Sequence, residues 1–505
     1  MRKRLLALLL GGALLFGCTG CVQSVQTLAD AATEAEQPVE VERVNRVGIP
    51  YRADSTLNPL AAENEFNFEA SLLIYDCLYD VDASFTATPK LATASTADGV
   101  NYTLLLREGV RFHDGSELDS SDVVATLNRV KNTESSPYHA RMAHVKTVEA
   151  SGAHAVNITL DRVDYRFPAC LNIPIVKNGS TADGAAGSGR YRPEGETLVA
   201  NEDWAFRTGE FSIGTVDLVN IEDYDALVDQ AGTGEISVFK LTDEDFSRVS
   251  LPGGFSSKAI ATNELVYLGV NLRNRHLGTA EFRRALSLSV DRGEILEDVL
   301  QKNGYVTQSV INPSYQYFST AAAAQFGAEK ADSLLMALGY TYGEDGALLS
   351  GGEQVSLRLV APEGSLSAVA ERVTAQLTKA GIAVELSLLP SSEYRTALSR
   401  KNFDLYLAEC KLSPDMDAGV MVGSGAALNY GGYASEEMDA AVRAVREAAD
   451  EETLRAAVSA EVTLTARDMP VVPLYFNTAT LLTRQKYGLQ MDPAPYSFFA
   501  GLEVS

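Results

Sequence analysis

Histidine, the residue that most often binds metals or moves protons, is scarce in this 505-residue chain. Its five occurrences are His113, His139, His144, His154 and His276. Zinc sites and metallohydrolases use closely spaced pairs such as HExxH or HxH, and no such pair occurs here, since His139 and His144 are five positions apart. The sequence therefore predicts no metal site and no metal cofactor.

Motifs of nucleophilic enzymes are equally weak. The one S-x-x-K match runs from Ser237 to Lys240, but Ile236 and Val238 alternate with polar residues as in a strand, whereas the penicillin-binding nucleophile begins a helix. The segment GSGR at 187–190 lacks the lysine and hydroxyl of a P-loop. Paired carboxylates are too common in an acidic chain to indicate a glycosidase, a class that is disfavoured without being eliminated. We expect a binding protein and not an enzyme.

The charge balance narrows the partners. Lys plus Arg number 42 against 67 Asp plus Glu, which gives a net charge of −25. Nucleic acid is not an expected partner, because phosphate binding requires clustered cations. The acidity could maintain solubility or attract cationic solutes. Beyond residue 21 only Cys77, Cys170 and Cys410 remain, an odd and widely spaced set that does not form a disulfide framework, although one pair stays open.

The N-terminus has the pattern of an export signal. Three basic residues at 2–4 precede an apolar or small-residue run at 5–17, which as a helix would rise only about 20 Å and is too short to span a bilayer. The run closes on Leu-Phe-Gly-Cys18, which resembles a lipoprotein cleavage site. We therefore expect a signal peptide at 1–18, a lipid on Cys18 and a polar tether at 19–42. An ordinary secretory signal is the alternative.

Apolar spacing in the second half of the chain predicts a β-α-β unit. Apolar residues alternate from Val355 to Leu359 as in a half-buried strand, and then fall at helical spacing from Leu366 to Leu377. Gly381 ends the helix, and alternation returns from Ile382 to Leu388. A right-handed crossover makes such strands parallel, so we expect an α/β fold whose ligands bind beyond the carboxyl ends of strands. Some 460 residues with 46% apolar composition predict at least two domains.

Further elements follow from the same reasoning. A second unit is predicted from the strand at 267–272 through a helix at 282–288, with Asp291 and Glu294 as a capping box for the next helix. A strand at Phe403–Leu407 puts Glu409 and Lys411 just beyond its carboxyl end, facing the expected cleft. The other predicted elements are a strand at 102–106, a turn at 113–115 and helices at 123–130, 438–445 and 454–462.

Seven motifs in order give the chain a family resemblance. The most specific is NYTLLLREGVRFHDGSEL at 101–118, followed by SDVV at 121–124. The others are LNP at 57–59, GSGRY at 187–191, YLGVN at 267–271, FRRAL at 282–286 with VDR at 290–292, NYGGY at 429–433 and PVVPLY at 470–475. Over essentially the whole mature chain the sequence resembles the extracytoplasmic solute-binding proteins of ABC importers in the oligopeptide, dipeptide and nickel class, solute-binding family 5.

The resemblance implies a two-lobed periplasmic-binding-protein-like clamp of type II, cluster C, with an extra domain inserted in the first lobe. The first lobe would comprise 43–66, 190–262 and 476–505, the extra domain 67–189 and the second lobe 263–475. Hinges would lie near Thr262 and Tyr475. Closure around a small solute, with an oligopeptide as the leading candidate, would present it to the permease subunits and ATPases of an ABC transporter, and the receptor would be a monomer.

The resemblance also implies ligand contacts. Peptide-binding members carry an acid for the peptide's amino terminus in a G-W-x-x-D-Y segment, and the equivalent stretch here is 409–415. Cys410 takes the place of the tryptophan and Ser413 that of the aspartate, so Asp415 or Asp417 could replace the acid. The expected ligand-binding residues are Tyr138, Glu409, Cys410, Lys411, Ser413, Asp415, Asn429, Tyr430, Asn64 and Phe66, with 64–66 corresponding to a cleft strand of the first lobe.

Other functions remain open at this point. A sensing or signalling receptor on the same fold would lack a cognate permease. Binding of nickel, haem or a sugar occurs on related proteins, although few and dispersed histidines do not support the metal. An extracellular hydrolase would need a nucleophile with its base, which the sequence does not supply.

Overall fold

The computed structural model describes residues 44–180, 186–242, 252–319, 328–499 and 502–504. The predicted signal peptide at 1–18, the predicted lipid attachment site at Cys18 and the predicted tether at 19–42 lie outside these ranges. Residues from Glu42 onward form one compact unit. Within the described ranges, every helix is too short or too polar to cross a bilayer.

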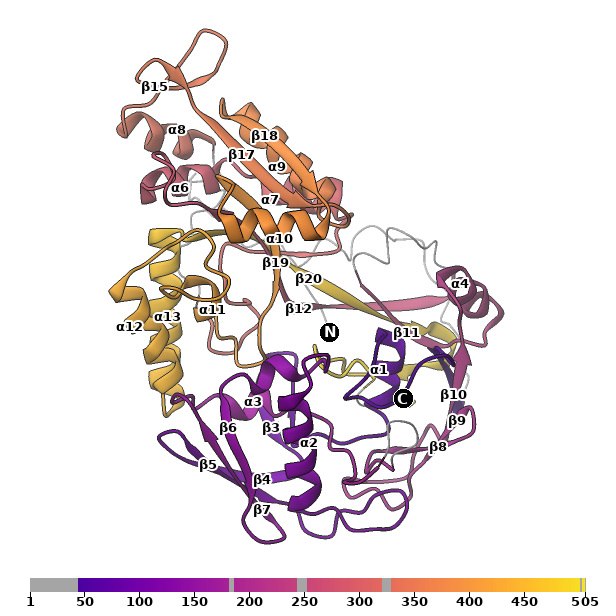
Figure 1. The fold of residues 1–505 in the computed structure, drawn as a ribbon. Helices are drawn as coiled ribbons and strands as arrows, with labels where there is room; N and C mark the ends of the chain where they lie inside the picture. Colours follow the sequence, from indigo (N-terminus) through magenta and orange to yellow (C-terminus); the bar gives the residue numbers. More distant parts are fainter. Residues whose placement is uncertain (1–43, 181–185, 243–251, 320–327, 500–501, 505) are drawn as a thin grey trace, which may run out of the picture. The chain divides into compact units, whose positions relative to one another are not determined.

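The largest sheet has seven strands and is mixed in direction (Figure 1). In order across the sheet its strands are β11 (Val238–Thr242), β20 (Val471–Arg484), β12 (Phe255–Val270), β19 (Leu405–Lys411), β17 (Ser356–Pro362) and β18 (Ala383–Leu389), with β13 (Tyr305–Val306) pairing with β20. Strands β17 and β18 are parallel and are joined by α9 (Ser367–Lys379), which confirms the predicted β-α-β unit. Helix α10 (Ser391–Arg400) continues the chain from β18 to β19.

Side-chain alternation along these strands separates two hydrophobic cores, one on each face of the sheet. In β12, Val266 and Leu268 pack with α9 and with α6 (Ala280–Leu288), whereas Leu265 and Tyr267 pack with α10, α12 (Glu436–Glu447) and α13 (Glu451–Asp468). Each fully buried side chain of this size contributes about 1.5–3 kcal/mol. Helices α12 and α13 confirm the helical spacing read between residues 438 and 462.

Two details of the predicted second unit were wrong. Strand β12 is antiparallel to both β19 and β20, so residues 267–288 do not begin another parallel β-α-β unit. Asp291 caps the next helix by accepting from Glu294 N at 3.0 Å, but its own backbone N–H donates to Gln376 Oε1 at 3.1 Å. The carboxylate of Glu294 instead bonds to Gln376 and Arg372, so half of the capping box is replaced by contacts with α9.

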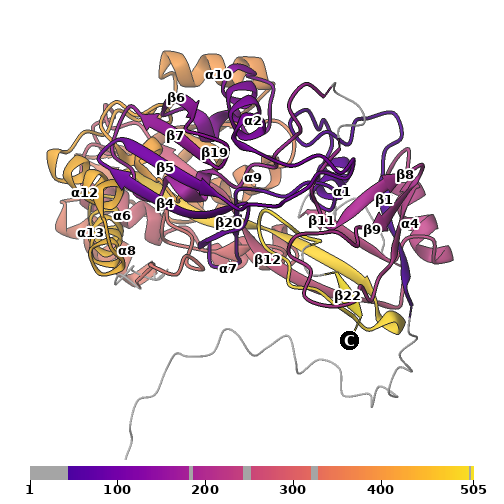
Figure 2. The ribbon, with the colours of Figure 1, turned by 90° about the horizontal axis from the view of Figure 1, so that it is seen from below.

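A second, antiparallel sheet contains β4 (Ala92–Asp98), β5 (Asn101–Leu106), β7 (Ala155–Leu160) and β6 (Val145–Ala150), in that order (Figure 2). Helix α2 (Ser120–Asn132) packs against β6 and β7. It begins with a complete capping box between Asp119 and Asp122. The predicted strand, turn and helix between residues 102 and 130 are thereby confirmed.

A third sheet consists of β1 (Arg46–Tyr51), β10 (Thr215–Asn220), β9 (Thr197–Ala200) and β8 (Tyr191–Glu194). The GSGRY motif precedes β8 and allows a close approach of two backbones. A Cβ atom at Gly187 would lie 2.0 Å from the carbonyl oxygen of Ile74, and one at Gly189 would lie 2.4 Å from the Ile74 carbonyl carbon. His113 N donates to Gly187 O at 2.8 Å, so the GSGRY motif is hydrogen-bonded to the HDG turn.

The remaining elements are short. They are α1 (Glu65–Ser71), β2 (Tyr79–Val81), β3 (Ala87–Pro89), η1 (His139–Met142), α3 (Phe167–Cys170), α4 (Tyr224–Thr233), α7 (Arg292–Glu294), the π-helical turn η2 (Ile295–Val299), α8 (Ala328–Ala337), β14 (Thr341–Tyr342), β15 (Leu348–Ser350), β16 (Glu353–Gln354), α11 (Gly419–Val422), η3 (Gln485–Tyr487), β21 (Leu489–Gln490) and β22 (Glu503–Val504). The cysteines at 77, 170 and 410 are buried and free.

Candidate ligand-binding site

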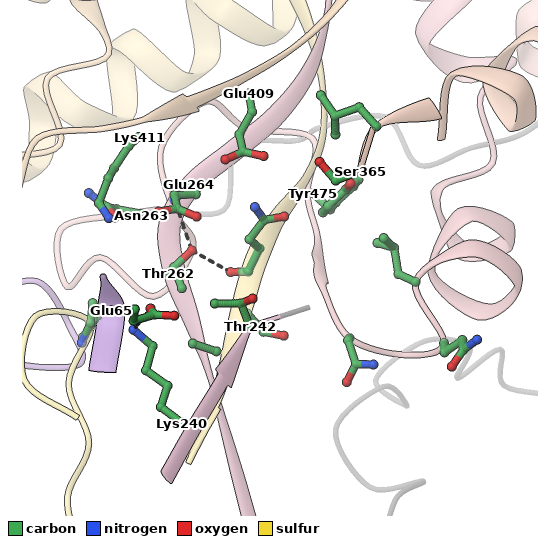
Figure 3. Close-up of a pocket in the computed structure, with 18 of the residues that line it drawn as sticks. Glu65, Lys240, Thr242, Thr262, Asn263, Glu264, Ser365, Glu409, Lys411 and Tyr475 are labelled. Carbon is green, nitrogen blue, oxygen red and sulfur yellow. Dashed lines mark hydrogen bonds and ion pairs between the residues drawn. The ribbon is translucent and has the colours of Figure 1, made fainter. Parts of the chain in front are cut away.

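A cavity of about 450 Å³ lies against strands β11, β12, β19 and β20 (Figure 3). This volume is typical of a small-molecule site. Glu65, Lys240 and Phe498, from segments predicted as the first lobe, line it together with Glu409 and Lys411 from the segment predicted as the second. Charged groups that are far apart in the sequence therefore meet at one partly enclosed space.

Lys240 is the most constrained charge at this cavity. Its ammonium pairs with Glu65 and, at 3.0 Å, with Glu69, and it lies 4.3 Å from the ring centre of Phe498. Burial alone would lower the pKa of Lys240, but the adjacent Glu69 and Glu65 carboxylates outweigh it and raise that pKa. Lys240 thus remains charged, with its donors directed at the protein's own carboxylates.

Lys411 and Glu264 form a second ion pair, 2.9 Å long, between neighbouring strands. Burial raises the pKa of Glu264, but the charge and hydrogen bond of Lys411 outweigh that effect and lower it. The Lys411 side chain is 65% exposed, so it can turn towards a ligand with little disruption.

Glu409 lies on the same face of β19 as Lys411, because side chains alternate along a strand. Strand β19 runs to Lys411, so both residues lie within the strand, and the prediction that they follow it was wrong by several positions. Cys410 between them points to the opposite face and is buried in the core with Tyr406 and Met416. It does not line the cavity.

Part of the cavity lining comes from the place where the long strands β12 and β20 lose their regular pairing. Their register shifts between Ala261 and Leu265. There Thr262 Oγ1 donates to Asn477 O at 2.9 Å, and the Thr262 carbonyl accepts from Asn312 Nδ2 at 2.7 Å. An irregularity of this kind re-aims side chains at binding sites. It coincides with the hinge predicted near Thr262, which remains a prediction.

Asp415, the predicted amine-binding acid, does not reach this cavity. It is 4% exposed, and its carboxylate accepts from Ser413 Oγ and, at 3.3 Å, from Asp417 N. Its backbone carbonyl accepts from Arg166 Nη1. Asp415 instead lines a separate cavity of about 300 Å³ with Tyr315 and Pro168. Ser413 and Asp415 are thus engaged with each other and with the protein.

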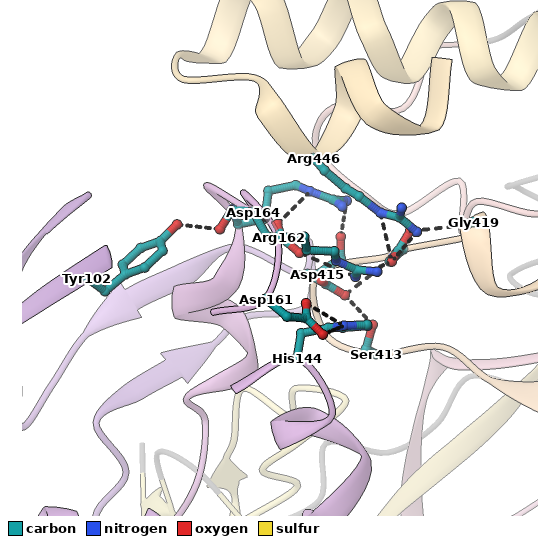
Figure 4. Close-up of polar contacts among 11 residues, drawn as sticks. Tyr102, His144, Asp161, Arg162, Asp164, Ser413, Asp415, Gly419 and Arg446 are labelled. Carbon is teal, nitrogen blue, oxygen red and sulfur yellow. Dashed lines mark hydrogen bonds and ion pairs between the residues drawn. The ribbon is translucent and has the colours of Figure 1, made fainter. Parts of the chain in front are cut away.

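Asp417 is the centre of a buried ionic network, and Figure 4 shows two of its cationic partners, Arg162 and Arg446, with the nearby Asp164 and Asp415. Its carboxylate accepts from Arg162 Nη2 at 2.7 Å and from Arg446 Nη2 at 3.0 Å. Burial raises the pKa of Asp417, but the surrounding guanidinium groups, with Arg166 foremost, outweigh it and lower that pKa. Burial raises the pKa of the nearby Asp164 carboxyl. Asp417, the second candidate for the acid that would bind a peptide's amino terminus, is therefore also engaged in ion pairs within the protein.

The loop residues Asn429 and Tyr430 shape their own turn. Asn429 Nδ2 donates to Gly423 O and Tyr433 O at 2.8 and 2.7 Å, and its Oδ1 accepts from the backbone N–H groups of Gly432 and Tyr433. The Tyr430 ring packs edge-on against Tyr406 at 5.8 Å. Neither residue lines the cavity.

Tyr138 is 1% exposed and packs against Phe68 and beneath the guanidinium of Arg141, whose carbon lies 4.8 Å from the ring centre.

The prediction of a cleft strand at 64–66 was wrong, because helix α1 begins at Glu65. Asn64 caps that helix by accepting from Asn67 N at 2.9 Å, and Phe66 packs against Tyr224. Glu65, in the first turn of α1, is the residue of this segment that lines the cavity.

Of the residues predicted to bind the ligand, Glu409 and Lys411 line the cavity, and their binding role remains a prediction. Lys240 and Glu264 also line it and were not predicted. One signal for Lys240 was present, since a lysine in an otherwise apolar strand requires a carboxylate partner. Glu65 and Glu69, four positions apart on one helical face, supply that partner. Lys240 and Glu69 are 171 positions apart in the sequence, so no local pattern could indicate that they meet.

The mixed sheet and the charged cavity beside its crossing strands define a solute-binding protein. The family model for "Bacterial extracellular solute-binding proteins, family 5 Middle" matches residues 86–425. The chain therefore belongs to family 5 of the bacterial extracellular solute-binding proteins. Oligopeptide-binding protein AppA of Bacillus subtilis (strain 168) is 25% identical over 526 aligned positions, covering 94% of each chain.

Solved structures confirm the predicted two-lobed fold class. The AppA protein of Bacillus subtilis in complex with a nonapeptide matches with a TM-score of 0.63 at 22% identity, covering 91% of this chain and 98% of that one. HbpA2 from Haemophilus parasuis gives 0.77 at 18% identity, covering 91% and 100%. A nickel ABC transporter protein from Bacillus halodurans gives 0.76 at 19% identity, covering 90% and 98%.

Proposed function

We propose that this protein is a lipid-anchored extracytoplasmic receptor that captures an oligopeptide between two closing lobes and delivers it to the permease of an ABC transporter. The cavity that joins Glu65 and Lys240 to Glu409 and Lys411 carries this proposal, because its walls come from both predicted lobes. The similarity to oligopeptide-binding protein AppA supports a peptide as the ligand.

The charges of the cavity suit a molecule with an ammonium at one end and a carboxylate at the other. Glu409 and Glu264 can accept from the ammonium, and the exposed Lys411 can donate to the carboxylate. Lys240 contributes by holding Glu65 in place. No histidine is among the described residues that line the cavity, so these residues offer nickel oxygen donors and none of the imidazole ligands that suit it.

Recognition by closure requires only that the ligand bind the closed form more tightly than the open form. A ligand that bridges Glu65 and Lys411 would do so, because those residues belong to different predicted lobes. The permease and its ATPases would then read the closed form. No covalent step is needed, and we propose none.

The test is the thermal unfolding of the purified protein with and without di- to nonapeptides, single amino acids, sugars, Ni²⁺ and haem. A ligand at a hundred times its dissociation constant adds about 2.7 kcal/mol to the free energy of unfolding, which raises the midpoint. We expect peptides alone to raise it. Glu409→Gln should reduce the peptide effect, whereas the exposed Glu452→Gln on α13 should not. A shift produced only by a non-peptide solute would overturn the peptide assignment.

A further inference from the structure

A tight turn near the C-terminus places two residues at the edge of the cavity. The backbone groups of Ala494 and Ser497 bond to each other in both directions, at 3.2 and 3.0 Å. Pro495 and Tyr496 therefore occupy the tip of the turn. Pro495 lines the cavity and Tyr496 does not.

The turn is held at the cavity wall by the cluster around Lys240. Phe498 N donates to Glu69 Oε2 at 3.2 Å, and Lys240 Nζ lies over the Phe498 ring. Glu69 and Lys240 are themselves paired. The position of the tip is thus fixed by Lys240, which lines the cavity, and by its buried partner Glu69.

From this turn the Tyr496 side chain enters the protein and is 7% exposed. Its ring meets Phe85 edge-on at 6.3 Å and lies 5.0 Å from the guanidinium carbon of Arg141. The same guanidinium lies over Tyr138, so Arg141 contacts both rings. Burial raises the pKa of Tyr496, and Cys170, Asp415 and Glu264 act in the same direction against Arg141.

The phenol of Tyr496 is poorly satisfied where it lies. Its hydroxyl is buried and has no hydrogen-bond partner among the described residues. Other buried tyrosines donate, as Tyr394 does to Leu407 O at 2.6 Å and Tyr191 to Ile213 O at 2.9 Å. A buried polar group without a partner is costly, and the packing around Tyr496 leaves that cost unrelieved.

Three residues expected at the ligand do not line the open cavity, and each is linked to this tyrosine. Tyr138 shares Arg141 with Tyr496, Cys410 belongs to the same buried cluster, and Asp415 acts on its phenol. Tyr496 follows Pro495, which lines the cavity, so the space that its side chain fills begins next to the cavity wall, and removing the side chain would open that space.

We propose that Tyr496 is a plug that closes the inner end of the peptide site and limits the length of peptide that the protein accepts. This inference rests on the proposed function. With the phenol in place, a peptide ends near Pro495. Without it, a further ligand residue can reach Arg141 and Asp415.

The experiment compares wild type, Tyr496→Ala, Tyr496→Phe and the control Tyr487→Ala, a tyrosine of η3 that does not belong to the buried cluster around Tyr496. Affinities are measured by calorimetry for alanine-based peptides of two to nine residues. Tyr496→Ala should shift the ratio of long-peptide to short-peptide affinity about tenfold or more towards long peptides, because one side-chain subsite is added. Tyr487→Ala should leave that ratio unchanged.

Tyr496→Phe supplies a readout that needs no ligand. Removing a hydroxyl that has no partner should raise the midpoint of thermal unfolding, whereas removing a bonded one lowers it. A lowered midpoint in Tyr496→Phe, or an unchanged length preference in a Tyr496→Ala protein that still binds peptides, overturns the plug. Absence of peptide binding in the wild type is a different result, which overturns the proposed function and the length selection that rests on it.

Discussion

Arg162 Nη2 lies 2.7 Å from Asp417 Oδ2, although the two residues are 255 positions apart. The ion pair joins the segment before α3 to the loop after β19, the strand that carries Glu409 and Lys411. Arg446 grips the same carboxylate, and Tyr165 N donates to Arg446 O at 3.0 Å. Asp417, one of the acids that the family resemblance suggested for ligand recognition, therefore holds the loop that follows β19, a strand that lines the cavity.

Replacing Asp417 with Asn should destabilise the protein by about 3–5 kcal/mol, because it leaves the buried Arg166 and the partly buried Arg162 and Arg446 without their counter-ion. Urea unfolding at neutral pH measures the change. Asp492→Asn is the matched control, since that side chain is 96% exposed and should change stability by about 0.5 kcal/mol or less. Equal losses in the two variants would contradict the structural role of the network.

Glu461 should make stability depend on pH. Burial first, and then the Asp417 charge, raise the pKa of its carboxyl from 4.5 to about 7. The folded protein therefore holds a proton that the unfolded chain has lost, and this contribution to stability declines as pH rises from about 4.5 to 7. Glu461→Gln should gain stability over wild type by up to about 3 kcal/mol between pH 5 and pH 8. Chemical denaturation at pH 5 and pH 8 measures the unfolding free energy of each protein, with the exposed Glu452→Gln as control. If the stabilities of wild type and Glu461→Gln changed equally between the two pH values, the assignment to Glu461 would be wrong.

Lys411→Met should separate ligand binding from stability. The side chain is 65% exposed, so the loss of its pair with Glu264 should cost about 1 kcal/mol or less in unfolding free energy. The affinity for a peptide carboxylate should fall by at least about tenfold, since a charge-assisted hydrogen bond contributes about 1.5–3 kcal/mol. Calorimetry against the peptide found in the thermal screen tests this. Lys146→Met, on an exposed position of β6, should alter neither quantity.

Gly187→Ala should weaken folding because the added methyl group would collide with the backbone of Ile74, which cannot move as a flexible side chain does. Overpacking of this kind costs about 1–3 kcal/mol or more. Gly209 has open space around its Cα and is the control, so Gly209→Ala should be neutral. Similar midpoints of thermal unfolding for the two variants would show that the backbones at Ile74 and Gly187 do not pack as closely as in this structure.

The proposed lipid anchor depends on Cys18. Cells given an alkyne-tagged fatty acid should label the wild-type protein, and Cys18→Ala should abolish the label and release the protein from the membrane fraction. Cys21→Ala should keep both label and location. Labelling that survives Cys18→Ala would move the attachment site or replace it with another mode of anchoring.

The local sequence determined which segments of this protein form many of its strands and helices. Alternation over two positions and helical repeats over three or four specify the strands β17 and β18, helix α9 and helices α12 and α13, because neighbouring residues alone decide which face of an element is apolar. The family motifs indicated the fold class, and in this chain the glycine of one of them, Gly187, allows the close approach to the backbone of Ile74.

The tertiary structure alone decided which of the charged residues are available to a ligand. Asp415 and Glu409 look equivalent in sequence, but one is buried beside Arg166 and the other lines the cavity. Lys240 finds Glu69 across 171 positions, and Tyr496 reaches Arg141 from the far end of the chain. Such pairings depend on how the elements cross and not on local spacing, because a charge or ring acts on whatever the fold brings within a few ångströms of it.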